Sequence, residues 1–191
     1  MNIETLHLNE GESALFGYGS LISIESLQDT LGRLYEGPFV MGELKGWQRG
    51  WDVAMPNQRR FYTEDLTGRM YPENILYLNV WSKPDNNVNG VVFVVNAVDL
   101  AAFDQREWIY SREDITNQLR TPVVQGGRAY VYVGKNEYRL TNVLSPVKAA
   151  VRTSYLHILE KGLGDLGNEF RTMFENSSDP VPRHLVIADQ R

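Results

Sequence analysis

The sequence contains no cysteine. This absence excludes disulfide bonds, thiol nucleophiles and metal sites with cysteine ligands. It is compatible with the reducing cytoplasm, where we expect the protein to be located. The three histidines, His7, His157 and His184, stand far apart and lack the His-x-x-x-His spacing of a zinc-binding helix. We therefore expect neither a metal centre nor a histidine-based triad.

Long apolar runs and a positive net charge are also absent. No apolar run approaches the roughly 18 residues that a membrane span needs, and the acidic, polar start MNIETLHLNEGES lacks the features of a signal or transit peptide. The formal net charge of −5 provides no overall basic field that would steer the protein to nucleic acid. We expect neither a membrane nor a nucleic acid as a partner.

The 191 residues, 42% of them hydrophobic, predict one domain that spans residues 1–191. Apolar stretches and turn residues predict an α+β fold with several, largely antiparallel strands. The predicted strands are residues 13–21, two strands with a glycine bend within 38–55, a hairpin of 75–81 and 90–96 around a turn at 83–89, and residues 121–133 and 137–143. Residues 56–74 are predicted to be a surface excursion.

Helices are predicted between these strands. The first is a helix over residues 24–31, with Ser23 as the N-cap and Gly32 at the end. A second helix is expected from Leu100, with Asp99 as its N-cap. The last two are a long helix from Ser145-Pro146, broken by the sequence GLGDLG, and a shorter helix over residues 168–174.

A carboxylate in the second predicted helix is the first candidate for chemistry. At about 100° per residue, Glu107 falls nearly above Leu100 and close to Phe103, on the apolar stripe of the helix. Apolar neighbours disfavour a charged carboxylate and raise its pKa, which suits a general acid and base near neutral pH. The alternative is a structural role, in which Glu107 reaches past the helix end to an arginine or a backbone amide.

The stretch LFGYGSL, residues 15–21, interrupts an apolar strand with Gly17 and Gly19. The third glycine of a dinucleotide-binding fingerprint would fall at Ile22, and the spacing also fits neither a phosphate-binding Walker loop nor a nucleophile elbow. Small residues just before a helix start expose backbone N–H groups, which suit a small anion such as a carboxylate. The alternative is a tight turn that requires a positive φ at glycine.

Several segments, in this order, resemble the γ-glutamylcyclotransferase superfamily, which includes the ChaC-like and AIG2-like proteins. They are Phe16-Gly17-Tyr18-Gly19-Ser20-Leu21, Leu44-Lys45-Gly46-Trp47-Gln48-Arg49, Gly90-Val91-Val92-Phe93, Phe103-Asp104-Gln105-Arg106-Glu107 with Tyr110, and Ser154-Tyr155-Leu156 with the glycine-rich stretch that follows. The resemblance spans nearly the whole chain. It implies an α+β fold, a small mixed β-barrel with flanking helices, and no cofactor.

The resemblance also implies an activity: cyclisation of a γ-glutamyl amine or peptide to 5-oxoproline, with release of the free amine. Glu107 would be the general acid and base, and Glu113 is a second carboxylate to consider. The residues implied in substrate binding are Gly17, Tyr18, Gly19, Ser20, Leu21 and Tyr110. A non-catalytic binding module and a γ-glutamyl hydrolase remain alternatives. The sequence leaves open the leaving amine and the oligomeric state, for which a homodimer is one alternative.

Overall fold

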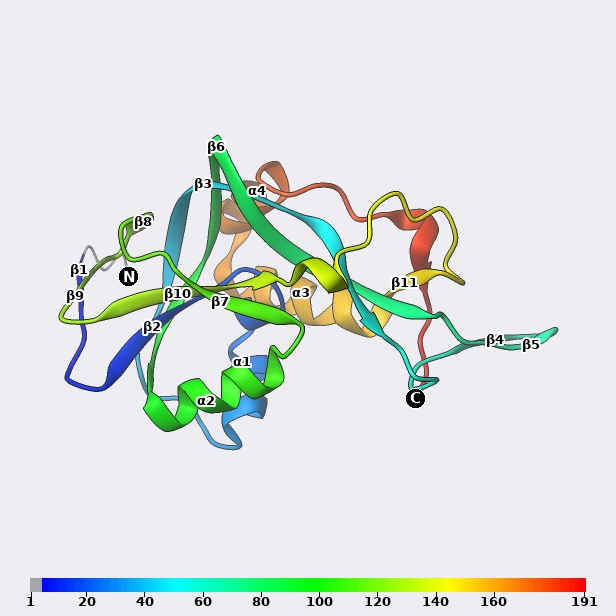
Figure 1. The fold of residues 1–191 in the computed structure, drawn as a ribbon, viewed down its shortest axis with the longest axis horizontal. Coiled ribbons are helices and arrows are strands. Elements are labelled where there is room, and N and C mark those ends of the chain that lie inside the picture. The colour runs from blue at the N-terminus through cyan, green and yellow to red at the C-terminus, as the bar shows by residue number, and fades with distance from the viewer. Residues whose placement is uncertain (1–4) are drawn as a thin grey trace.

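The computed structural model describes residues 5–191, and two long strands form its centre. Strand β3 (Phe39–Pro56) pairs antiparallel with β6 (Asn74–Asn96), from Phe39 opposite Phe93 to Pro56 opposite Asn74. The register shifts between Lys45 and Trp47. Figure 1 shows β6 turning sharply there, with β3 beside it. These two bent strands therefore run through the sheet on both sides of the bend.

The predicted hairpin of residues 75–81 and 90–96 is wrong, because β6 is one continuous strand of 23 residues. Lys45 stands opposite Asn87 and Trp47 opposite Ser82, so residues 83–86 bulge opposite Gly46. Asp85 has a φ of 72° and Gly46 a φ of 81° within this irregularity. The polar and proline-containing segment marks a bend in a strand. The two strands expected within 38–55 are likewise one bent strand.

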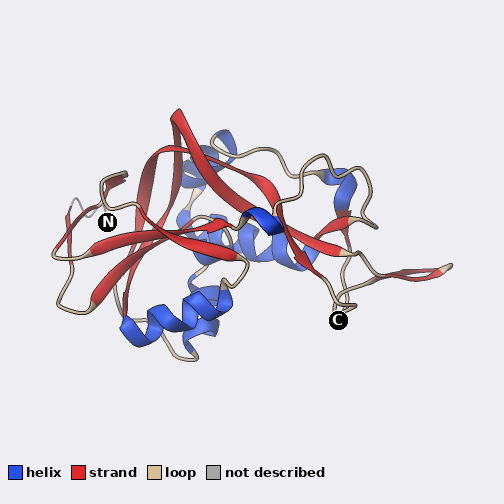
Figure 2. Cartoon of the chain, viewed as in Figure 1, coloured by secondary structure: helices blue, strands red, loops and turns tan. Residues whose placement is uncertain are grey.

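The other strands extend the sheet mainly along the edge of β6 that β3 does not occupy. Near the end of β6, β2 (Glu12–Gly17) pairs antiparallel with it, followed by β10 (Arg128–Gly134) and β7 (Tyr110–Asp114). At the start of β6, β11 (Ala149–Arg152) pairs with it and β12 (Val186–Ile187) pairs with β11, while β8 (Leu119–Thr121) pairs with β3. The sheet mixes parallel and antiparallel pairs and curls into a half-barrel with flanking helices (Figures 1 and 2). The expected α+β class is confirmed.

The remaining strands of the described chain form two small sheets. Strand β1 (Thr5–His7) pairs with β9 (Val123–Gln125), and β4 (Thr63–Asp65) forms a hairpin with β5 (Gly68–Met70). This hairpin projects from the body of the molecule in Figure 1, as a surface excursion at residues 56–74 predicts.

Within residues 5–191, four α-helices and three short 3₁₀ helices flank the sheet. They are α1 (Ile24–Leu31), α2 (Ala97–Arg106), α3 (Thr153–Leu166), α4 (Asn168–Asn176), η1 (Ser20–Ile22), η2 (Asn136–Tyr138) and η3 (Arg183–Leu185). The predictions for α1 and α4 are confirmed: the Ser23 side chain caps α1, and Gly32 ends it with a φ of 65°. None of the helices in residues 5–191 is long and apolar enough to cross a membrane.

The predicted start of α2 is wrong. The helix begins at Ala97, and the Asn96 side chain accepts hydrogen bonds from the N–H groups of Val98 and Asp99, each at 2.9 Å. Asp99 lies in the first turn and pairs with Arg33 instead, at 2.5 Å. Asparagine is as good an N-cap as aspartate, and β6 ends at this residue, so tertiary structure decided between them.

The region after residue 136 also differs from the prediction. Residues 137–143 form no strand beyond an isolated bridge at Arg139, and the helix expected from Ser145 is a turn followed by β11. Residues 149–151 are fully buried between β6 and β12, and an apolar run in such a buried strand resembles a helix face. Helix α3 then continues through Gly162 and Gly164 and ends only at Gly167, with a φ of 90°.

Candidate active site

The loop after β2 explains the two glycines of the LFGYGSL stretch. A positive φ occurs at neither Gly17 nor Gly19, so the alternative of a turn that requires it is wrong. A Cβ on Gly17 would instead lie 2.8 Å from the Cβ of Leu21, and one on Gly19 would lie 3.0 Å from the hydroxyl oxygen of Tyr155. The glycines let the loop fold tightly on itself and approach α3.

The same loop presents unpaired backbone donors. Within residues 5–191, no acceptor binds the N–H groups of Gly19, Ser20 and Leu21. The next two N–H groups, of Ile22 and Ser23, are used in the 3₁₀ turn, where they donate to the carbonyl oxygens of Gly19 and Ser20. Consecutive free N–H groups in a turn form a concave site with partial positive charge, which suits a carboxylate.

Glu107, which was predicted to lie within the helix, is the residue that directly follows it. Helix α2 ends at Arg106, and the N–H of Glu107 closes the last turn by donating to the carbonyl oxygen of Phe103 at 2.8 Å. The side chain of Glu107 is only 16% exposed, and this burial raises its pKa, while the charge of Arg106 lowers it by a smaller amount. The Nε of Arg106 lies 3.0 Å from Oε1 of Glu107. Burial and an arginine partner, which the sequence offered as alternatives, are therefore both present.

Arg106 connects this carboxylate to the glycine loop and to α1. Its Nη2 donates to the hydroxyls of Ser20, at 2.9 Å, and Ser26, at 3.0 Å. Its Nη1 donates to the carbonyl oxygen of Ser26 at 2.8 Å and to the hydroxyl of Thr30. One guanidinium thus fixes the positions of Glu107, the loop and α1. This role of Arg106 was not expected from the sequence, although its position beside Glu107 could have indicated it.

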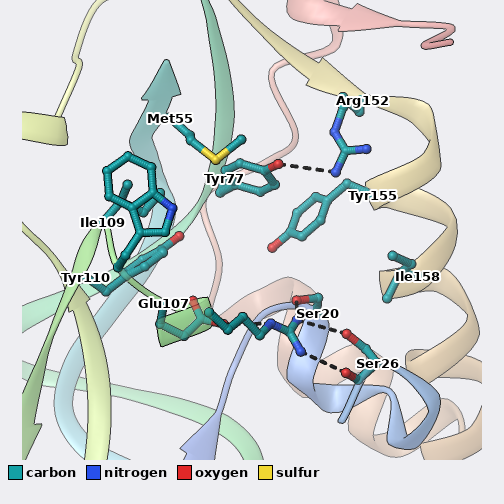
Figure 3. A pocket seen from close by; sticks show the side chains of 12 residues that line it. Ser20, Ser26, Met55, Tyr77, Glu107, Ile109, Tyr110, Arg152, Tyr155 and Ile158 are labelled. Atoms are coloured by element: carbon teal, nitrogen blue, oxygen red, sulfur yellow. Dashed lines mark hydrogen bonds and ion pairs between the residues drawn. The ribbon is translucent and has the colours of Figure 1, made fainter. Parts of the chain in front are cut away.

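Two adjoining hollows meet at Glu107. The larger, about 210 Å³, is lined by Ser20, Ser26, Met55, Tyr77, Arg106, Glu107, Trp108, Ile109, Tyr110, Arg152, Tyr155 and Ile158 (Figure 3). The smaller, about 40 Å³, is lined by Phe16, Gly17, Tyr18, Gly19, Ser20, Leu21, Leu78, Glu107, Tyr110, Tyr132 and Tyr155. The two share Ser20, Glu107, Tyr110 and Tyr155. The structure therefore brings together Glu107 and all six residues predicted to bind substrate.

Comparison with known proteins identifies the fold. No protein-family model and no curated protein matches the sequence. A solved γ-glutamyl cyclotransferase is similar with a TM-score of 0.57 and 15% identity, over 89% of this chain and 90% of that chain. An uncharacterized protein from Homo sapiens has a TM-score of 0.58 and 15% identity, over 90% and 91%. A γ-glutamyl cyclotransferase specific to glutathione, from yeast, has a TM-score of 0.50 and 12% identity, over 88% and 96%.

The chain has the γ-glutamyl cyclotransferase fold. Within this fold, backbone carbonyl groups hold two of the tyrosines around Glu107, Tyr110 and Tyr18. The hydroxyl of Tyr110 donates to the carbonyl oxygen of Leu78 at 2.8 Å, and that of Tyr18 donates to the carbonyl oxygen of Tyr132 at 2.7 Å. Burial raises the pKa of both tyrosines well above its ordinary value. Both therefore keep their protons at neutral pH, and neither is a base.

Glu113, the second carboxylate considered from the sequence, is exposed on β7 and lines neither hollow. The γ-glutamyl cyclotransferase fold instead places Tyr77, Arg152 and Tyr155 at the site, which sequence reasoning did not assign to it. They come from β6, β11 and α3, which meet only through tertiary packing. Among residues 5–191, no cluster of histidine and acidic side chains could hold a metal ion.

Proposed function

We propose that the protein is an enzyme that cyclises the γ-glutamyl group of an amine or peptide to 5-oxoproline and releases the free amine. The observation that carries the proposal is the position of Glu107. This partly buried carboxylate, with its raised pKa, lies where two hollows adjoin, and the smaller hollow is lined by Gly19, Ser20 and Leu21, whose N–H groups have no acceptor within residues 5–191. The fold shared with γ-glutamyl cyclotransferases supports the proposal.

The glycine loop binds the glutamyl end of the substrate. The free N–H groups of Gly19, Ser20 and Leu21 accommodate its α-carboxylate in the smaller hollow, which is too small for more than the head of an amino acid. This binding folds the glutamyl chain so that its α-amine approaches its own γ-carbonyl carbon. Because the attack is intramolecular, correct folding of the substrate supplies much of the acceleration.

Glu107 transfers the proton. As a carboxylate it accepts a proton from the α-amine while the amine nitrogen forms a bond to the γ-carbonyl carbon. The bond from that carbon to the leaving nitrogen then breaks, and Glu107 returns the proton to the leaving amine. One Glu107 oxygen pairs with Arg106, and no donor from the described part of the chain binds the other, so it is free for this transfer. No water is consumed, which distinguishes the reaction from hydrolysis.

The test is release of 5-oxoproline from a panel of γ-glutamyl amino acids, peptides and amines. We expect the wild type to release 5-oxoproline, the Glu107→Gln variant to bind substrate but lose at least about 10²-fold in kcat, and the Glu113→Gln variant to keep wild-type turnover. Free glutamate in place of 5-oxoproline would indicate a hydrolase. Binding without any product would indicate a binding module. Undiminished turnover in Glu107→Gln would remove this residue from the mechanism.

A further inference from the structure

A second cavity of ligand size lies outside the candidate active site. Its volume is about 380 Å³, compared with about 210 Å³ for the larger of the two hollows at Glu107. It lies between α3, the end of α4 and the chain segment 178–183, which leaves α4 and runs toward β11 (Figure 1). Cavities of this size with mainly apolar walls are typical of binding sites for small molecules.

The segment 178–183 covers the cavity without filling it. Its two prolines have no N–H group that could donate to a neighbouring strand, so the segment does not extend the sheet. At one end, the N–H of Asp179 donates to the carbonyl oxygen of Arg49 at 2.9 Å. Beyond the other end, the side chain of Leu185 is buried. The segment is therefore attached at both ends and leaves space behind its middle.

The inner wall of the cavity is apolar. It is formed by residues of the two long strands, α3 and α4, namely Trp51, Leu78, Leu156, Leu159, Leu163 and Phe174. All six belong to the hydrophobic core or pack against it. An apolar group that enters the cavity contacts this wall, and the removal of both surfaces from water favours its binding.

Leu78 separates this cavity from the active site. It lines both the cavity and the smaller hollow beside the glycine loop. Trp51 packs edge-on against Tyr155, with ring centroids 6.1 Å apart, and Tyr155 lines both hollows of the active site. Glu107 does not line the cavity. The cavity is thus a separate site on the other side of the active-site wall.

The lining carries more negative than positive charge. It includes three carboxylates, Glu160, Glu175 and Asp179, and one cation, Arg183. Arg171, outside the lining, is shared by two of the carboxylates, at 2.7 Å from Glu160 and 3.8 Å from Glu175. The Asp179 carboxylate accepts a hydrogen bond from a neutral amide at 3.1 Å and forms no ion pair within residues 5–191. Even with Arg171 counted, an excess of negative charge remains at this rim.

We infer that this cavity binds a small apolar amine, whose ring or chain contacts the apolar wall and whose ammonium group lies among the carboxylates of the rim. An ammonium group has three donors and no acceptor, which matches carboxylate oxygens. An anionic ligand would instead meet charge of its own sign. The inference does not depend on the proposed function, because Glu107, Arg106 and the glycine loop lie outside this lining.

Tryptamine and tryptophol provide the test, because they share an indole ring and differ in an ammonium group and a hydroxyl. Both are titrated into the wild type by calorimetry at neutral pH. We expect tryptamine to bind roughly 3- to 10-fold more tightly, the contribution of carboxylates at an exposed rim. In the double variant Glu175→Gln and Asp179→Asn, this ratio should fall to about one. The affinity for tryptophol should stay unchanged there, which shows that the cavity is intact.

Glu169→Gln is the matched control, because Glu169 is an exposed glutamate of the same helix, α4, and does not line the cavity. It should keep the full ratio. Glu107→Gln should also leave both affinities unchanged, since its carboxylate belongs to the active site. In heteronuclear NMR spectra, the indole N–H resonance of Trp51 should shift when either compound is added.

Several results would overturn the inference. They are failure of both compounds to bind, equal affinity of the two in the wild type, a ratio that survives in the double variant, and an unchanged Trp51 resonance. Loss of tryptamine binding in Glu107→Gln would also overturn it, because the amine would then bind in the active site. Release of 5-oxoproline is measured without these compounds, so the proposed function succeeds or fails independently.

Discussion

Arg106 and Glu107 are neighbours in the sequence, and the Nε of the first lies 3.0 Å from Oε1 of the second. This contact opposes the effect of burial. Burial raises the pKa of Glu107, while the adjacent positive charge lowers it to a smaller extent. The guanidinium thus holds the carboxylate in place and limits the rise in its pKa. A base for the α-amine of a substrate needs both properties, a fixed position and a pKa near the working pH.

The raised pKa of Glu107 predicts a pH-dependent cost in stability. In the unfolded chain this glutamate ionises at its ordinary pKa, whereas in the folded protein it ionises at a higher pH. Its contribution is therefore fully present below the unfolded pKa and is lost as the pH rises through the folded pKa. Relative to wild type, Glu107→Gln should gain stability over that window and keep the gain above it. Urea unfolding from about pH 4 to about pH 8 measures this difference. A variant that loses stability over the window would show that the Arg106 contact dominates.

Removing the charge of Arg106 should move the acid limb of the pH–activity profile. In Arg106→Met, burial acts on Glu107 without the opposing charge, so its pKa rises further. We expect the acid limb of kcat/KM to shift to higher pH and the unfolding free energy to fall by about 1–3 kcal/mol, because the partners at Ser20 and Ser26 lose their donor. Arg128→Met removes an exposed arginine and should leave the pH of the acid limb unchanged. A fall in activity without a shift would indicate a structural role alone.

Two glycines of α3 should respond in opposite ways to alanine. A Cβ on Gly162 would lie 2.8 Å from Cγ1 of Ile22 and 3.0 Å from its carbonyl carbon and oxygen, whereas a Cβ on Gly164 meets nothing within 4 Å. Gly162→Ala should therefore destabilise the protein by about 1–3 kcal/mol and disturb η1 beside the glycine loop. Gly164→Ala should stabilise it by roughly 0.5–1 kcal/mol through helix propensity. Thermal and urea unfolding of both variants check this, and an equal response would contradict the close contact.

Arg49 ties the end of α4 to the loop at Tyr18. It is completely buried, its pKa is lowered by burial to about 9, and within the described chain no carboxylate pairs with it. It donates instead to the carbonyl oxygens of Asn89 at 2.7 Å, Phe174 at 3.1 Å and Tyr18 at 3.4 Å. Arg49→Met should leave these acceptors unpaired and cost at least about 3 kcal/mol of unfolding free energy. The exposed Arg120→Met serves as the control, with an expected change within about 0.5 kcal/mol. A loss that small for Arg49→Met would contradict this role.

Local chemistry explains which elements were predictable. The helix at Ile24–Leu31 has its cap, its apolar face and its terminal glycine within ten residues, so the sequence contains all the information that it requires. Strand β6 does not, because residues 83–86 carry turn chemistry, and only pairing with β3 keeps the chain extended on both sides of them. Similarly, residues 149–151 became a strand because β6 and β12 provide backbone partners on both sides.

The features of the candidate site likewise fall into those that the sequence predicted and those that only the tertiary structure decided. The sequence by itself determined the α+β class. It also predicted a carboxylate in apolar surroundings at Glu107 and a glycine loop that suits an anion, since both depend on neighbours in the chain, but it left a structural alternative open for each. Only the tertiary structure decided that Glu107 faces that loop, that Arg106 connects them, and that Arg152 enters the same cavity from a strand more than forty residues away. The physical reason is that burial and charge pairing depend on distances in space, which become defined only when the strands and helices pack together.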